Sequence, residues 1–308
     1  MMFKNSIKLL CANFDKVWKL LVFHILCFAL CFGFLCVFYN LYTDAVVLAW
    51  ESTNLPEVFK TGTFYGFTVS NVLIGIVDML YIFFQTIFAQ SVFGGIYFCI
   101  IIFYVLPFLT NIGKYVINEM MYGFMSSAQK QSFTGTFLRT LRKSSQFASI
   151  KTLYSIPFNA LIIFSMIGLA KIQNNVFDYL LPLIFVIVPS VLFAFKQTFS
   201  AGWSPAMVVF DVGVCKAFRI GSKAMLRRGA RVFSTAFVIF LLAIVLSLIL
   251  GIYSIIIILP IAFPLVDIFE MTAFFSSQGM RFYVDYDTIL SPKKLEEVDK
   301  IEKAKFIL

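Results

Sequence analysis

Charged side chains are scarce in this chain. Only 13% of its 308 residues are Asp, Glu, Lys or Arg, whereas 60% are hydrophobic and the mean hydropathy is +0.91. This composition excludes a water-soluble globular domain, in which about a quarter of the residues are charged. The chain therefore belongs in a membrane.

Residues that carry catalytic chemistry are also scarce. The single histidine, His24, lies in an apolar stretch without a second His or a Cys or acidic cluster at metal-ligand spacing. The six cysteines form no CxxC pair, and the chain has no phosphate-binding glycine loop and no GxSxG elbow. We therefore expect no enzyme, no bound metal and no cofactor, with His24 buried against a neighbouring helix.

Long apolar segments predict an all-α, polytopic membrane protein. A helix needs about 20 apolar residues to cross a bilayer, and six segments approach that length. We expect one integral membrane domain over residues 1–280, a charged tail over 281–308 and an external loop over 43–62. The predicted spans are about 17–39, 92–110, 153–170, 179–199, 232–250 and 252–275.

The cations are sorted into alternate loops between these spans. With six spans, only Lys60 and Lys171 of the 25 basic residues face outward. The positive-inside rule then places both termini in the cytoplasm of a multi-pass protein of the cell membrane. The net charge of +9 therefore points to anionic lipid headgroups on the cytoplasmic side, and not to nucleic acid.

Several amphipathic segments are suited to lying in the membrane interface. They cover about 1–16, 66–90, 131–150 and 214–231. Around 131–150 the cations Lys130, Arg139, Arg142, Lys143 and Lys151 form a basic segment, with Phe133, Phe137, Leu141 and Ala148 on the opposite helical face. In segment 214–231, cations at i, i+3 and i+4 steps form one stripe, which we call the cationic stripe and expect to contact anionic lipid. Its members are Lys216, Arg219, Lys223, Arg227 and Arg231, and the other side carries Val214, Phe218, Met225 and Val232.

Segment 66–90 can be interpreted in three ways. Asn71, Asp78 and Gln85 recur at seven-residue spacing and form one polar seam on an apolar helix. The segment is apolar enough to span, but a crossing here would place the basic segments on opposite sides. The charge rule therefore favours an interfacial helix on the outer face, while a re-entrant or spanning helix remains an alternative.

A unit of interfacial helix, outward span and return span occurs three times, as three pseudo-repeated hairpins. The return spans share a similar apolar run ending in proline: 101–107, 183–189 and 255–260. Seven residues after each proline stand Lys114, Lys196 and Asp267, with Glu270 one turn after Asp267. Charges inside a membrane are costly unless paired, so Asp267 is expected to pair with Lys114 or Lys196. The alternative is that both lysines reach the headgroups and Asp267 pairs with a nearby basic loop.

The layout resembles that of certain bacterial six-span integral membrane proteins, and of the membrane domain attached to some glycerophosphodiester phosphodiesterases. The resemblance rests on the three hairpins, the basic segment Lys216–Arg231 and the closing run from Thr272-Ala273-Phe274-Phe275 to Met280-Arg281-Phe282-Tyr283. It implies a helical membrane domain. The catalytic barrel of those phosphodiesterases is missing from this chain, so their activity and site residues are not transferred.

Three classes of function follow. The first is a non-enzymatic membrane protein that acts through lipid or a membrane-protein partner, as a scaffold, assembly factor or transporter accessory. The second is a small transporter or channel that uses intramembrane charged residues (Lys114, Lys196, Asp267 and Glu270), together with the three proline-kinked return helices and the polar seam. The third is a membrane-embedded lipid enzyme, which needs catalytic groups that the sequence lacks. The missing motifs favour the first class.

Overall fold

The computed structural model describes residues 2–53, 55–56, 69–127, 131–170, 177–250 and 259–278. Within these residues every regular element is a helix and no strand occurs. In the described part of the chain, five helical segments are long and apolar enough to cross a membrane: Val17–Glu51, Val92–Ser126, Phe133–Leu169, Leu183–Phe210 and Gly229–Leu246. The predicted all-α class is confirmed, and the apolar helices support a membrane protein.

The described residues fall into two compact units. The first takes residues from Met1–Cys27, Pro107–Leu153 and Phe193–Leu308, and the second takes residues from Phe28–Leu106 and Tyr154–Leu192.

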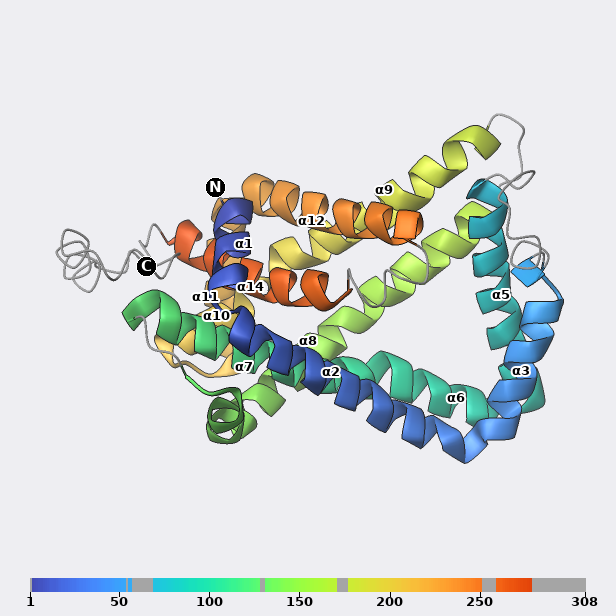
Figure 1. Ribbon diagram of the computed structural model, residues 1–308, viewed down its shortest axis with the longest axis horizontal. Helices are drawn as coiled ribbons and strands as arrows, with labels where there is room; N and C mark the ends of the chain where they lie inside the picture. Colours follow the sequence, from blue (N-terminus) through green and yellow to red (C-terminus); the bar gives the residue numbers. More distant parts are fainter. Residues whose placement is uncertain are drawn as a thin grey trace. The chain divides into compact units, whose positions relative to one another are not determined.

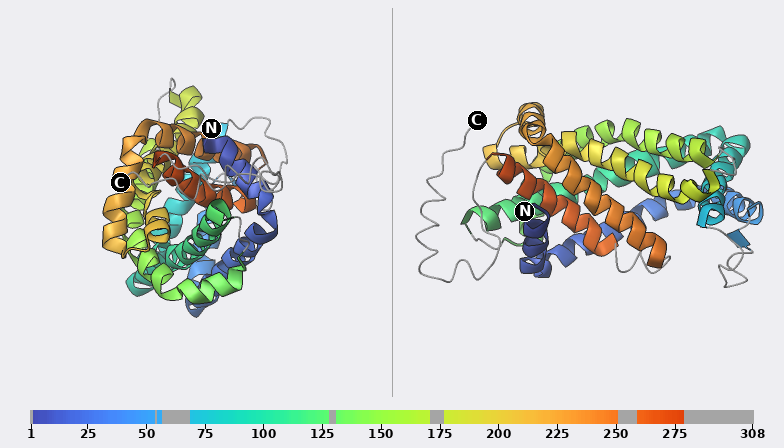
Figure 2. Two further views of the ribbon diagram at one scale, coloured as in Figure 1. Left: turned by 90° about the vertical axis from the view of Figure 1, so that its left-hand side faces the viewer. Right: turned by 90° about the horizontal axis from the view of Figure 1, so that it is seen from above.

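The first unit is built around helix α14 (Leu259–Ser277). Helices α1 (Met2–Ala12), α10 (Trp203–Phe210), α11 (Val214–Arg227) and α12 (Gly229–Leu250) all contact it. Figures 1 and 2 show α12 running beside α14. Because neighbours surround α14, its residues from Pro264 to Phe275, among them the charged Asp267 and Glu270, are buried except Val266.

Helix α1 corresponds to most of the predicted interfacial segment 1–16. It ends at Ala12, a turn follows at Asn13, and the long helix α2 begins at Phe14 (Phe14–Leu35). One side of α1 packs on α14, where the hydroxyls of Ser6 and Thr272 lie 2.9 Å apart. Part of this amphipathic helix therefore faces protein.

Helix α8 corrects two predicted boundaries. Residues 131–150 and 153–170 were expected to form an interfacial helix and a separate span, but Phe133–Ala170 is one continuous helix of 38 residues. Its buried face in the first unit carries Thr136, Thr140 and Ser144, whereas Leu141, expected on the apolar side, is 44% exposed. The hydroxyls of Thr140 and Ser144 bond to carbonyls of their own helix, which makes their burial inexpensive.

Helix α7 (Leu106–Ser127) runs alongside the first part of α8 in the first unit. The side-chain amide of Asn111 donates to the Thr152 hydroxyl at 3.1 Å, and the ring centres of Tyr115 and Phe147 are 5.8 Å apart. Near the other end of the pair, Arg139 bonds to Glu119 at 3.1 Å. The contacts run in reverse order along the two helices, so α7 and α8 are antiparallel.

The short helix α10 has no counterpart in the sequence prediction. Its residues from Trp203 to Val208 are buried, and it packs on α11 through an unusually close backbone contact. A Cβ atom added to Gly202 would lie 2.5 Å from the carbonyl oxygen of Gly221. The two glycines therefore allow α10 and α11 to approach where any side chain would collide.

The second unit contains α3 (Tyr39–Glu51), α5 (Val69–Gln90) and α6 (Val92–Ile100). Helices α3 and α5 lie side by side (Figure 1) and bury a core of Tyr42, Ala45, Ala49, Phe83 and Ile87. The predicted external loop over 43–62 is therefore wrong for residues 43–51, which are helical. Residues 57–62 lie outside the described part of the chain.

A π-helical turn, η2 (Ile101–Val105), connects α6 to α7 just before Pro107. Proline lacks a backbone N–H, and its ring collides with the carbonyl of the residue four positions earlier in a regular α-helix. The wider turn accommodates this proline while the chain remains helical. Helix α9 (Phe177–Ser200), which covers the predicted span 179–199, instead carries Pro189 inside an α-helix.

Candidate functional site

Four charged side chains meet in the interior of the first unit. Lys114 of α7 lies with its Nζ atom 2.6 Å from Glu270 Oε1 and 3.2 Å from Asp267 Oδ1, both on α14. Lys151 of α8 places its Nζ atom 3.7 Å from the same Glu270 oxygen. We call Lys114, Lys151, Asp267 and Glu270 the charge cluster.

The charge cluster is buried. The exposed fractions of the side chains are 9% for Lys114 and Asp267, 3% for Lys151 and 0% for Glu270. Two cations and two anions balance in this group, which is the condition under which buried charges are tolerated. The chemistry of this arrangement is that of a neutral ionic network that joins α7, α8 and α14.

The sequence prediction brought together three of these four residues. It placed Lys114 and Asp267 seven residues after their prolines, with Glu270 one turn after Asp267, and the structure brings these three side chains together. The third cation of that set, Lys196, is partly exposed on α9 and interacts electrostatically with Lys114 and Glu270.

Lys151 is the member that sequence reasoning missed, because it was grouped with the cations of a basic surface segment. Its Nζ donates to the Ser200 carbonyl oxygen at 3.2 Å and lies 5.5 Å from the centre of the Trp203 ring. A usable signal existed: Lys151 falls on the helical face of Ser144, Phe147 and Ala148, all of which are buried.

Trp203 links the charge cluster to α11. Its indole N–H donates to the Ser222 hydroxyl at 2.8 Å, and its ring lies 4.2 Å from that of Phe218. Phe218 and Ser222 both belong to α11. The cation–π contact with Lys151 and these two contacts form one continuous chain of side chains from Glu270 to α11.

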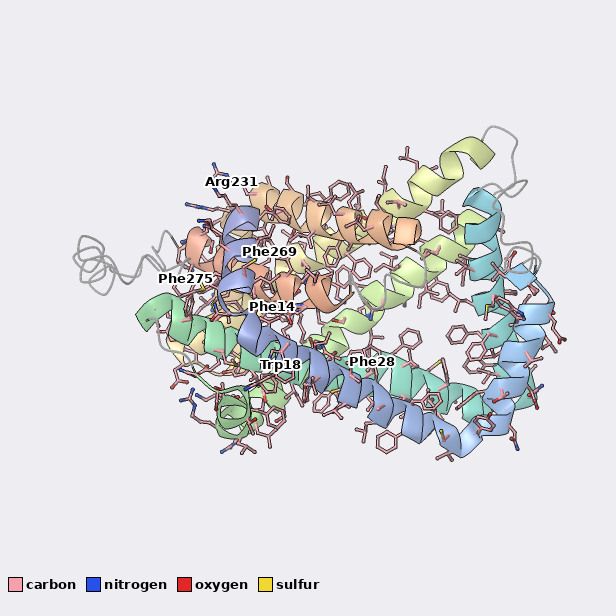
Figure 3. All side chains as sticks on the ribbon, viewed as in Figure 1. Phe14, Trp18, Phe28, Arg231, Phe269 and Phe275 are labelled. Carbon is pink, nitrogen blue, oxygen red and sulfur yellow. The ribbon has the colours of Figure 1, made fainter. Side chains whose placement is uncertain are left out.

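The cationic stripe lies on α11 and the start of α12, and all five of its members are exposed. The face opposite the stripe matches the prediction in part. Met225 and Val232 are buried as expected, but Phe218 is 43% exposed. The rest of the buried face of α11 is formed by the small residues Ala217, Gly221 and Ala224, because α10 lies so close. In Figure 3 the Arg231 side chain extends outward from α12.

The predicted polar seam lies on α5 in the second unit. Asp78 and Gln85 are both exposed, while Val77 and Ile87 are buried on another side of the helix. Asn71 belongs to α5, but its side chain lies outside the described residues. The seam and the charge cluster therefore belong to different units.

Other groups considered from the sequence have ordinary surroundings. His24 bonds to the backbone of Thr110, and Cys27 and Cys31 are both buried. Within the described ranges, no group of three or more His, Cys, Asp or Glu is placed to hold a metal ion. No protein-family model matches the chain, and no curated protein or solved structure matches it either.

Proposed function

We propose that this chain is a non-enzymatic integral membrane protein that acts through anionic lipid and membrane-protein contacts, as a scaffold, assembly factor or transporter accessory. The observation that carries the proposal is the pairing of an exposed cationic stripe with a tightly packed inner face on the same helix, α11. A helix of this kind attracts an anionic surface with one side while the other side fixes it to the fold. The burial and charge balance of the charge cluster support a packed interior.

The proposed topology has six spans in three hairpins, with both termini in the cytoplasm. The sixth span, 252–275, is assigned to α14, whose described residues begin at Leu259. The separation of basic segments from acidic outer segments supports this arrangement, and α5 is assigned to the outer face.

Single cysteines in a cysteine-free background test this topology. A membrane-impermeant maleimide is expected to label Thr53→Cys in intact cells, and Ser145→Cys and Ser291→Cys only after permeabilisation. The physical reason is that the reagent cannot cross the bilayer to reach cytoplasmic positions. Labelling of positions 53 and 291 from the same side would contradict six spans.

Neutralising the cationic stripe tests the lipid contact. Changing Arg219, Lys223 and Arg227 together to Gln is expected to weaken retention of phosphatidylglycerol over phosphatidylcholine about a hundredfold, since each near-surface cation contributes about 1 kcal/mol. Lipid that remains with the purified protein after reconstitution is the measurement. Changing Arg219 and Arg227 to Lys keeps the charge and serves as the matched control. Equal retention of both lipids by the wild type would refute the proposed lipid contact.

A small transporter or channel is the second candidate. It is favoured by one observation: Glu270 is fully buried, and its Oε2 atom accepts no hydrogen bond from the described residues. Ionisable groups within a membrane protein mark ion or proton pathways in many systems. Proton or cation flux into protein-containing vesicles that is lost in Glu270→Gln, and stays lost when Lys151→Gln is added to restore the charge balance, would favour this candidate over the first.

A further inference from the structure

The link between α11 and α12 forms a hollow of about 550 Å³. It lies where the candidate span Gly229–Leu246 begins. We call it the elbow hollow. It is lined by Leu226, Arg227, Arg228, Gly229, Ala230 and Arg231. Of the six described residues that line it, three are arginines and none is acidic.

The Arg228 side chain lines the elbow hollow and is held in place by a hydrogen bond. Helix α11 ends at Arg227, and the Arg228 backbone leaves the helical conformation with φ −124° and ψ 29°. Its guanidinium donates from Nη1 to the hydroxyl of Ser276 on α14 at 3.2 Å, so the side chain is anchored and only partly exposed. Arg227 and Arg231 flank it and are exposed.

Arginine groups of this kind recognise phosphate. The planar guanidinium presents two parallel N–H donors that match two phosphate oxygens, a geometry that a lysine ammonium cannot supply. The exposed Leu226 on the same rim and the apolar helix that begins at Gly229 would meet the apolar part of a lipid.

We propose that the elbow hollow is a stoichiometric binding site for a phosphate group, with Arg228 as its fixed contact and Arg227 and Arg231 closing over the ligand. The source is either the headgroup of a phospholipid or a free phosphate. This site deepens the proposed function, because it adds one defined phosphate position to a stripe that otherwise attracts anionic lipid by diffuse charge.

Titration of the full-length detergent-purified protein tests the proposal, with short-chain phosphatidic acid as the probe and native mass spectrometry to count bound molecules. We expect one tightly bound lipid in the wild type and about tenfold or more weaker binding in Arg228→Gln, which loses a charge-assisted bond. Arg228→Lys should also bind the lipid more weakly, because it keeps the charge but loses the two parallel N–H donors of the guanidinium.

Lys216→Gln is the matched control, since it removes one cation from the same stripe. Lys216 precedes Arg227 by about 16 Å along the helix axis, which is beyond the screening length of about 8 Å in physiological salt. We therefore expect its binding constant to change less than about twofold. Because Arg228 also anchors α14, a second variant, Arg227→Gln with Arg231→Gln, removes two exposed contacts and should weaken binding without lowering the melting temperature.

The outcomes separate this site from the proposed function. Equal loss in Arg228→Gln and Lys216→Gln, or several equivalent lipids instead of one, would overturn the site and leave the diffuse lipid contact in place. If the wild type showed no preference for anionic lipid, both the phosphate site and the diffuse lipid contact would be refuted. Inorganic phosphate and glycerol 3-phosphate form the second arm: competition by these soluble anions at equal concentration assigns the site to free phosphate, and its absence assigns it to a lipid headgroup.

Discussion

Glu270→Gln is expected to destabilise the protein by about 3–5 kcal/mol, because it leaves two buried lysines to share one carboxylate. Glu270 is fully buried and lies within 4 Å of the Nζ atoms of both Lys114 and Lys151. Without its charge, the charge cluster carries a net positive charge in a low-dielectric interior. Thermal unfolding of the purified protein in detergent, compared with the wild type, measures the loss.

A double variant tests whether the loss comes from uncompensated charge. Adding Lys151→Gln to Glu270→Gln restores neutrality and leaves the pair of Lys114 and Asp267, so much of the stability should return. Glu119→Gln is the matched control on α7, because its partner Arg139 is 59% exposed and such pairs contribute only about 0–1 kcal/mol. Strictly additive losses for the two substitutions in the double variant would show that the charges are not coupled.

Asp267→Asn gives a related comparison. The sequence alone left Lys114 and Lys196 as equal candidates to partner Asp267, and the ion pair that the structure places there is with Lys114. We therefore expect that adding Lys114→Gln to Asp267→Asn recovers stability. Rescue by Lys196→Gln instead would contradict the structure.

Composition and spacing were sufficient for the helical class and for much of the charge cluster. Long apolar runs specify helices whatever their neighbours, because backbone groups in a membrane must bond internally. The seven-residue step from proline to charge brought Lys114 and Asp267 to one level, since two helical turns separate each charge from its proline. These features depend on local sequence, and local sequence is what periodicity reports.

The missed features depend on tertiary contacts. Lys151 was interpreted as a surface cation because α8 was expected to break before its span, whereas the helix continues and carries Lys151 inward. Helix α10 is too short and too uniformly apolar to show a helical period. The inner face of α11 was assigned to bulky residues, of which Met225 is buried there and Phe218 is not. The closeness of α10 explains why Ala217 and Gly221 lie beside Met225 in place of Phe218.

Gly221→Ala is expected to destabilise the protein by about 1–3 kcal/mol or more, although alanine normally stabilises a helix interior relative to glycine by about 1 kcal/mol. The added Cβ would lie 2.5 Å from the carbonyl carbon of Gly202 and 2.9 Å from the backbone nitrogen of Trp203. Both are backbone atoms, so α10 itself has to move. That shift would also pull Trp203 away from Lys151 and from Ser222.

Gly33→Ala is the control, because a Cβ at Gly33 in α2 meets nothing within 4 Å. It should leave the melting temperature unchanged or raise it, so the two alanine substitutions should have opposite signs. Tryptophan fluorescence adds a second readout, since a displaced Trp203 changes its emission in Gly221→Ala and keeps it in Gly33→Ala. If Gly221→Ala were as stable as the wild type, α10 and α11 would not be in backbone contact. The inference that α11 has a packed inner face, on which the proposed function depends, would then be wrong.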